Sequence, residues 1–179
     1  MEQISVYVFT QKPSSAALEP TLTLALTAEE RTRSRYRYRI NGDITDGEGR
    51  IIDLSPGSLE TSEGDEIYLE LPRGTLLRHG DCLSGNDHTQ VLRIVAKPEP
   101  VLTVRASANA QSSVDRAFLQ LLRAAYHLGN RHVALEVGVD YLRLAPDPVL
   151  ETLLHQLGVT VTAETVPFQP ESGAYGHHH

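Results

Sequence analysis

Two histidines stand five positions apart in the stretch AAYHLGNRHVAL, residues 124–135. Imidazole nitrogen is a ligand that suits nickel, copper and zinc, so the pair raises the question of a metal site. Ligands that share one face of a helix are three or four residues apart, which His127 and His132 are not. The Gly129-Asn130 step between them favours the end of a helix. We therefore expect the two histidines to have different roles.

Three further histidines, His177, His178 and His179, follow a stretch rich in Pro, Gly and Ser that shows no periodicity. We interpret residues 169–179 as a flexible tail, and a short histidine tract is a composition associated with metal binding. The alternative interpretation is a remnant of an expression tag. Tails from two chains would raise the number of ligands around a shared ion toward the six of octahedral coordination.

The sequence offers little catalytic machinery. Cys82 lies beside His79 and Asp81 in RHGDC, which is a conceivable nucleophile arrangement, although a turn with chance neighbours is the simpler interpretation. There is no GxSxG motif, no phosphate-binding GxxxxGKS or GxxxxGKT loop and no HExxH motif. We predict that the protein is not an enzyme.

Arginine recurs at every second position from residue 31 to residue 39, in RTRSRYRYR. On a strand this spacing places five positive charges on one face and Tyr36 and Tyr38 on the other. Sheets that bind RNA expose stacking aromatic side chains within a basic surround, and the carboxyl half offers neither. The net charge of −7 also disfavours nucleic acid. We expect a solvated strand, or one that binds an acidic protein, and no nucleic-acid partner.

The composition, with 40% hydrophobic and 22% charged residues among 179, is that of a folded globular protein. A single cysteine, Cys82, excludes an internal disulfide and any CxxC metal or redox motif, which suits a reducing cytosol. No apolar run approaches the ~20 residues of a membrane span, and the amino terminus lacks the features of a signal peptide. We expect a cytoplasmic protein that does not enter a membrane.

The first half of the chain has the pattern of short strands separated by turns such as NGD, SPGS and PRGT. The strand-like segments are SVYVF, LTLAL, RSRYRYRI, RIIDL, EIYLEL and VLRIVAK. KPEP, residues 97–100, has two prolines between charged residues and is typical of a linker or boundary. We therefore predict an all-β domain over residues 1–97.

The period of the pattern changes after this boundary. VLTVRA predicts a strand, and an amphipathic helix follows from a cap at Ser112 or Ser113 to about Leu128; its apolar positions are 114, 117, 118, 121, 122, 125 and 128. HVALEVGVD and YLRLA predict two strands, Asp147 and Pro148 start a second helix that Gly158 ends, and VTVTAETV is the last strand.

This β-α-β-β-α-β order predicts a ferredoxin-like domain over residues 98–168, with both helices on one face of a four-stranded sheet. The fold class is α+β: an all-β domain, a ferredoxin-like domain and the tail. We place His132 at the start of a strand, where His132, Ala134 and Glu136 face away from the helices. A symmetric dimer formed through that open face would bring two copies of His132 together. The alternative is a surface histidine with no task.

Four segments together resemble one protein family nearly end to end: YHLGNRH (126–132), LPRGTLLRHGD (71–81), LTAEERTRSR (26–35) and PFQPESGAYGHHH (167–179). They are similar to the UreE urease accessory proteins, which are nickel metallochaperones. The resemblance implies an amino-terminal domain like the peptide-binding domain of a heat-shock cochaperone, and a ferredoxin-like domain that forms a homodimer. It also implies that the histidine closing GNRH, His132, is the essential ligand and that the pair bridges the dimer.

The expected cargo is therefore Ni²⁺, for which Zn²⁺ or Cu²⁺ would substitute in vitro, with His177, His178 and His179 as labile ligands. The expected partners are the urease accessory GTPase and the apo-urease complex. The chain departs from some family members in YLRLAPDPVLE, residues 141–151, which has no further histidines, and in its short tail. Storage of many ions is not expected. The alternative function is a peptide-binding cochaperone module with incidental histidines.

Overall fold

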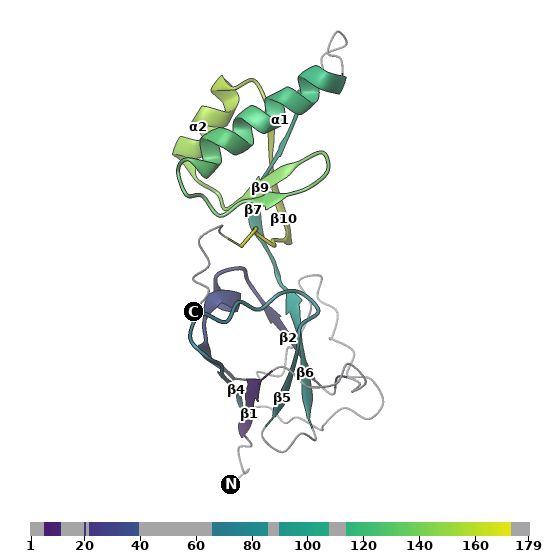
Figure 1. The fold of residues 1–179 in the computed structure, drawn as a ribbon, viewed down its shortest axis with the longest axis vertical. Coiled ribbons are helices and arrows are strands. Elements are labelled where there is room, and N and C mark those ends of the chain that lie inside the picture. Colours follow the sequence, from purple (N-terminus) through teal and green to yellow (C-terminus); the bar gives the residue numbers. More distant parts are fainter. Residues whose placement is uncertain are drawn as a thin grey trace. The chain divides into compact units, whose positions relative to one another are not determined.

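The protein is described from a computed structural model that places residues 6–11, 20, 22–39, 66–85, 90–107 and 114–172. The chain forms two compact units, Met1–Lys97 and Pro98–His179, which are described separately (Figure 1). None of the helices in the described residues combines the length and the apolar character needed to cross a membrane.

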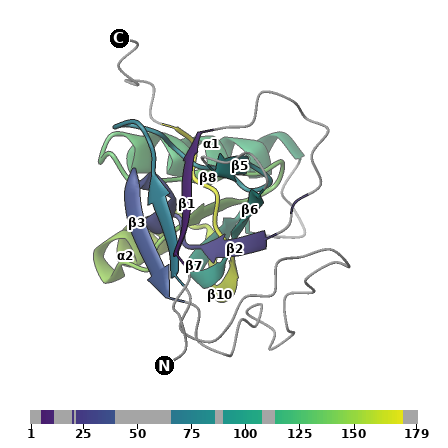
Figure 2. The same ribbon diagram turned by 90° about the horizontal axis from the view of Figure 1, so that it is seen from below.

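The amino-terminal unit is built on one mixed β-sheet with the strand order β2-β6-β5-β1-β4-β3. Its strands are β1 (Val6–Gln11), β2 (Leu22–Leu26), β3 (Arg35–Arg39), β4 (Glu66–Glu70), β5 (Cys82–Gly85) and β6 (Val91–Ala96). A single 3-10 turn, Glu30–Thr32, precedes β3, which lies at an edge of the sheet next to β4 and β1 (Figure 2). The predicted all-β half is confirmed, and the predicted strand RIIDL lies outside the described residues.

Alternation along the strands explains the core of this unit. In β2 the side chains are buried at every second position, and in β4 Ile67 and Leu69 are buried between half-exposed or exposed neighbours. Strand β5 was not predicted, because Cys82 was placed in a turn. The packed side chains include Phe9, Leu22, Leu24, Leu26, Ile67, Leu69, Leu71, Leu77, Leu83, Leu92 and Ile94.

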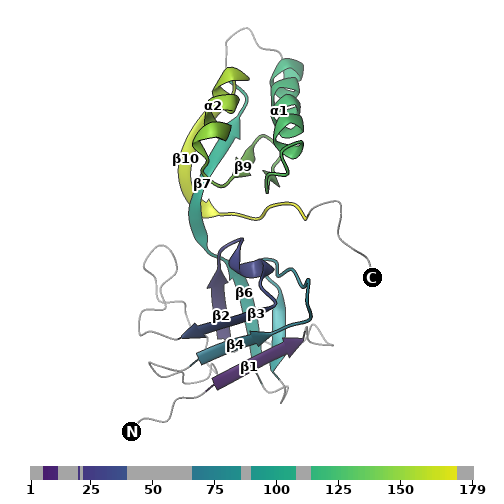
Figure 3. The same ribbon diagram turned by 90° about the vertical axis from the view of Figure 1, so that its left-hand side faces the viewer.

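The carboxyl-terminal unit is a four-stranded sheet with the order β10-β7-β9-β8, in which every neighbouring pair is antiparallel. Its elements are β7 (Pro98–Arg105), α1 (Val114–Gly129), β8 (Glu136–Val137), β9 (Leu142–Leu144), α2 (Pro148–Gln156) and β10 (Thr160–Pro167). In chain order the sheet reads fourth, first, third, second, which is the ferredoxin-like arrangement. Both helices lie on one face of the sheet, as predicted (Figure 3). Residues 98–100 of the predicted linker are part of β7.

The second helix begins and ends where the sequence predicts. The Asp147 carboxylate accepts hydrogen bonds from the N–H groups of Val149 and Leu150, at 2.8 and 3.0 Å, and Pro148 is the first helical residue. Gly158 follows the helix with φ of 74°, a left-handed conformation that costs glycine little. Ser112 and Ser113, the predicted caps of α1, lie outside the described residues.

The apolar stripe of α1 is wider than the face that the sheet covers. Ala124 and Leu128 are fully buried, whereas Phe118 is 60% exposed, Leu122 49% and Tyr126 66%. The last three are spaced four residues apart, so they form a second stripe beside the buried one. The prediction that Phe118 and Leu122 face the core is wrong, and an apolar surface of α1 is left open.

Candidate metal site

The carboxyl-terminal end of α1 closes in a Schellman turn. The N–H of His132 donates to the carbonyl of Gly129 across 3.0 Å, and the N–H of Val133 donates to the carbonyl of Leu128 across 3.4 Å. Val133 and Leu128 also belong to the same apolar cluster, which is the contact that accompanies this turn. Packing of these two side chains therefore fixes the backbone on either side of His132.

His132 occupies the left-handed position of the turn, with φ of 55°, and it is the one residue other than glycine with positive φ among the described residues. Glycine is the usual residue here, and a side chain costs of order 1 kcal/mol. Gly129 ends the helix close to the predicted position, but His132 takes the left-handed conformation, and the prediction that His132 starts a strand on the open sheet face is wrong. Strand β8 begins only at Glu136.

The side chains predicted to face the core at Val133 and Leu135 do so, although the segment is not a strand. Val133 and Leu135 pack against the core of the carboxyl-terminal unit, as predicted, although Val137 is 52% exposed. Residues 133–135 between the turn and β8 are not part of a strand. His132 therefore projects from a turn and not from a sheet.

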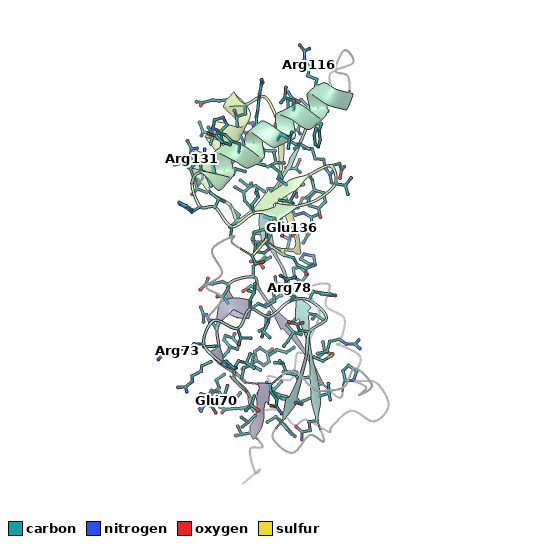
Figure 4. The ribbon with its side chains drawn as sticks, in the orientation of Figure 1. Glu70, Arg73, Arg78, Arg116, Arg131 and Glu136 are labelled. Carbon is teal, nitrogen blue, oxygen red and sulfur yellow. The ribbon has the colours of Figure 1, made fainter. Side chains whose placement is uncertain are left out.

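The imidazole of His132 is exposed, and no hydrogen bond or ion pair engages it within the part of the chain that the structure describes. It stands at the carboxyl end of a 16-residue helix, where the helix dipole favours a cation. Arg131 lies at the same end (Figure 4) and donates from Nη1 to the carbonyl of His127 across 2.8 Å. That bond satisfies the carbonyl of His127 near the end of the helix. Arg131 therefore does not engage the His132 imidazole, which is available as a ligand.

His127 lies in the last turn of α1, apart from the turn that carries His132. Its ring lies edge-on to Tyr126, with 5.4 Å between the ring centroids, and its side chain is half-buried. No group of three or more His, Cys, Asp or Glu side chains that could hold a metal ion occurs in the described residues. His177, His178 and His179 lie outside these residues.

The open face of the sheet carries a polar network rather than an apolar surface. Arg143 donates from Nη1 to Glu136 Oε1 (3.1 Å) and from Nε to Thr103 Oγ1 (3.3 Å), and Thr103 donates to Glu164 (2.6 Å). Tyr141 also donates to Glu136 Oε1 across 2.8 Å, a hydrogen bond that, with partial burial, raises the pKa of Tyr141. The network joins all four strands. Its side chains on the open face of the sheet are therefore hydrogen-bonded to one another.

The chain beyond β10 is attached to the residues that follow His132. The N–H of Gln169 donates to Glu136 Oε2 across 2.6 Å, and the N–H of Glu171 donates to the carbonyl of Leu135 across 2.8 Å. Phe168 is 2% exposed. The predicted flexible tail is thus hydrogen-bonded to the sheet as far as Glu171.

The side chains around Cys82 serve the local backbone. His79 Nδ1 accepts a hydrogen bond from the N–H of Ala96 across 3.1 Å, and Asp81 Oδ2 accepts one from the N–H of Arg78 across 2.9 Å. The Cys82 thiol lies 3.8 Å from the carbonyl oxygen of Gly80. These contacts favour chance neighbours over an activated nucleophile, although Cys82 begins strand β5 and does not lie in the predicted turn.

The arginine-rich segment forms a shorter ladder than predicted, because Arg31 and Arg33 precede the strand. Arg31 is buried in the 3-10 turn. Arg35 pairs with Glu70 at 3.3 Å and Arg37 with Glu66 at 3.6 Å. The two tyrosines of the strand pack against the core, as predicted.

Comparison with known proteins agrees with this arrangement. Residues 57–97 match the amino-terminal domain, and residues 99–179 the carboxyl-terminal domain, of the UreE urease accessory protein. A urease accessory protein UreE of a Nostoc species is 50% identical over 159 residues, which are 89% of this chain and 88% of the relative. That of Nostoc punctiforme is 48% identical over 172 residues, 96% of each chain.

A third relative, the urease accessory protein UreE of Microcystis aeruginosa, is 48% identical over 157 residues, 88% of this chain and 80% of its own. These relatives are accessory proteins and not enzymes. With matches to both domains and close identity across most of its length, the chain belongs to the UreE urease accessory protein family.

Proposed function

We propose that the protein is a nickel chaperone for urease assembly, and that two copies of the chain hold Ni²⁺ between their His132 side chains. The observation that carries the proposal is the position of His132. His132 occupies a left-handed position where glycine would be more stable. Its imidazole is exposed at a helix end that favours cations. A ligand role explains both properties.

A single His132 binds a metal ion weakly, so the proposal needs a second copy. The exposed stripe of Phe118, Leu122 and Tyr126 leads along α1 toward the turn that carries His132. An open apolar stripe of this kind is typical of a protein interface. Two copies packed through this stripe about a twofold axis would bring their His132 residues close together.

The open sheet face is less suited to the dimer than the sequence suggested. Its Glu136 and Arg143 side chains are 13% and 18% exposed and are already paired with each other. Burying such a face against a second copy would desolvate charges without new partners. The homodimer is therefore proposed through α1.

The remaining ligands in this proposal come from His177, His178 and His179 of the tails. Nickel accepts up to six nitrogen or oxygen ligands, and the fixed His132 pair supplies two. The two His132 ligands are fixed and do not complete the coordination of the ion, whereas the tail histidines are labile. Ligands can therefore exchange one at a time as the ion passes to a recipient. Zn²⁺ and Cu²⁺ also accept imidazole and are expected to compete in vitro.

The proposed recipients are the urease accessory GTPase and the apo-urease complex, acting in the cytoplasm. Support for these partners comes from family membership, since the relatives are named urease accessory proteins.

Equilibrium dialysis against nickel tests the proposal with wild type, His132→Asn and His155→Asn. Asparagine tolerates the left-handed conformation, so the first variant removes the imidazole and leaves the turn in place. His155 is an exposed histidine on α2, and it controls for unspecific binding. We expect tight binding at one ion per dimer in wild type and His155→Asn and its loss in His132→Asn. Weak binding in all three would favour the peptide-binding cochaperone with incidental histidines, and tight binding retained in His132→Asn would contradict His132 as the primary ligand.

A further inference from the structure

Gly129 is the last residue of α1, and its backbone does not require a glycine. It has a helical conformation, and the left-handed position of the turn belongs to His132. A glycine inside a helix is less stable than an alanine, because it loses more backbone freedom on folding. The end of α1 therefore carries a residue that local stability disfavours.

Packing within the single chain does not require a glycine at this position either. A Cβ atom built on Gly129 meets no other described part of the chain within 4 Å. By contrast, a Cβ atom built on Gly138 would overlap the ring of Tyr141. Gly129 is exposed, so a side chain there would enter open space in one copy of the chain.

Gly129 continues the exposed apolar stripe of α1. Leu119, which is 44% exposed, lies beside this stripe. Exposed positions recur at spacings of three, four and three residues, at Leu119, Leu122, Tyr126 and Gly129. Two helices of a coiled coil pack along a seam with this spacing. Gly129 is the member of the series at the carboxyl end of α1, two residues before Arg131 (Figure 4).

A shared ion restricts where two copies of α1 can meet. Two nitrogen ligands of one ion lie within about 4 Å of each other, because each is ~2 Å from the metal. If two antiparallel helices crossed at Leu122, their His132 residues would lie about 30 Å apart, at ~1.5 Å per residue from the crossing point. The twofold axis must therefore pass the carboxyl end of α1. Residues beside a twofold axis contact their own copies, so Gly129 faces a second Gly129.

The backbone of Gly129 is linked directly to that of His132. Its carbonyl accepts the hydrogen bond from the His132 N–H across 3.0 Å. The separation of the two helix ends therefore sets the separation of the two imidazoles. Packed helices lie about 8–10 Å apart according to the side chains at the contact, and a methyl group on each copy would add about 1 Å. Metal–ligand distances tolerate only about 0.2 Å.

We infer that Gly129 is a positioning residue for the proposed metal site: its missing side chain lets the two α1 helices approach closely enough for both His132 imidazoles to bind one ion. The inference rests on the proposed function. An alanine at position 129 leaves the single chain intact but holds the imidazoles apart. Nickel affinity then falls by about tenfold or more.

Gly129→Ala in the full chain is the first test, with Thr152→Ala as the matched control. Thr152 is an exposed residue of α2, and its replacement also puts alanine in place of a poorer helix former. Thermal denaturation without metal should show both variants about 1–4 °C more stable than wild type. Calorimetric titration should show weaker nickel binding in Gly129→Ala alone.

The opposite signs of these two effects separate positioning from folding. A glycine that only supports the fold would lose stability and nickel affinity together when replaced. Unchanged nickel affinity in Gly129→Ala, or a less stable apo-protein, overturns the inference. Tight nickel binding retained in His132→Asn would instead overturn the proposed function.

Cysteine cross-linking locates the closest approach of the two helices. The variants Gly129→Cys, Leu122→Cys and Thr152→Cys are made in a Cys82→Ser background, because Cys82 is the single native cysteine. A disulfide requires Cα atoms about 4.4–6.8 Å apart. With diamide as oxidant and without metal, we expect Gly129→Cys to form the disulfide-linked dimer fastest and Thr152→Cys to form none. Faster cross-linking of Leu122→Cys than of Gly129→Cys overturns the inference.

Discussion

The Tyr36 hydroxyl donates to Oε1 of Glu30 across 2.6 Å, and Thr27 holds the other carboxylate oxygen with its N–H and its hydroxyl. The Glu30 N–H lies 3.3 Å from Thr27 Oγ1, which completes a reciprocal capping box on the 3-10 turn before β3. Burial alone would raise the pKa of Glu30, but these hydrogen bonds outweigh it and the pKa is lowered.

Removal of the Tyr36 hydroxyl should destabilise the amino-terminal unit. A hydrogen bond to a charged group contributes about 1.5–3 kcal/mol, and partial exposure reduces the expected loss for Tyr36→Phe to about 1 kcal/mol. Urea denaturation measures it. Tyr38→Phe is the control, because Tyr38 also packs against the core. Equal losses in the two variants would contradict a specific role for the Tyr36–Glu30 bond.

The same pair sets a pH window for stability. The folded pKa of Glu30 is lowered from about 4.5, so its contribution is full above that value and is lost as the pH falls through the folded pKa. Burial and then the hydrogen bond to Glu30 raise the pKa of Tyr36 from 10.0 to about 12, so its contribution is lost as the pH rises through that range. Glu30→Gln should flatten the acid limb of a stability–pH profile measured by urea denaturation and should reduce the alkaline limb, which keeps the part that burial causes; an unchanged profile would refute this.

Substitutions at His132 should separate folding from metal binding. His132→Gly relieves the left-handed strain and should raise the apo-protein's free energy of unfolding by about 0.5–1 kcal/mol. It should also abolish tight nickel binding. Chemical denaturation and calorimetric titration of the same preparation measure the two effects. A destabilised His132→Gly would show that the side chain, and not the backbone, supports the turn.

The apolar stripe of α1 should decide the oligomeric state. Phe118→Glu and Leu122→Glu each place a charge in the proposed interface, twice per dimer, and should weaken dimerisation roughly a hundredfold. Sedimentation velocity measures the shift toward monomer, and circular dichroism checks the fold. Val149→Glu alters an equally exposed apolar residue on α2 and should leave the dimer intact. Wild type that sediments as a monomer would refute the interface.

Gly138 should tolerate no side chain while Tyr141 is present. Alanine would drive the ring from its place between Glu136 and the Arg143 guanidinium, which lies 4.4 Å from the ring centroid. We expect Gly138→Ala to cost about 1–2 kcal/mol in wild type and far less in a Tyr141→Ala background. Thermal denaturation of wild type, the two single variants and the double variant gives the coupling free energy between Gly138 and Tyr141. Additive losses of stability would contradict the prediction.

The sequence predicted elements wherever one local signal dominates. The Asp147-Pro148 cap and Gly158 are such signals, and α2 begins and ends with them. Strand β5 has no alternation to detect, because Leu83, Ser84 and Gly85 are all buried in succession.

The details of the candidate site depend on packing that no short motif contains. The type of His132 and the family resemblance predict a ligand, but its left-handed turn is fixed by contact between Leu128 and Val133. Likewise, periodicity showed that α1 is apolar over a wide arc, whereas only the crossing of helix and sheet decides that Phe118 faces outward.

Because His132 has a left-handed backbone, the residue that best stabilises the fold at position 132 differs from the one proposed to bind nickel. A library screened only for survival of heating without metal should enrich glycine or asparagine at position 132, because both relax that turn. The survivors would be better folded and unable to bind nickel tightly. Stability engineering of this protein should therefore hold position 132 constant, since substitutions that stabilise the fold there would remove the proposed nickel ligand.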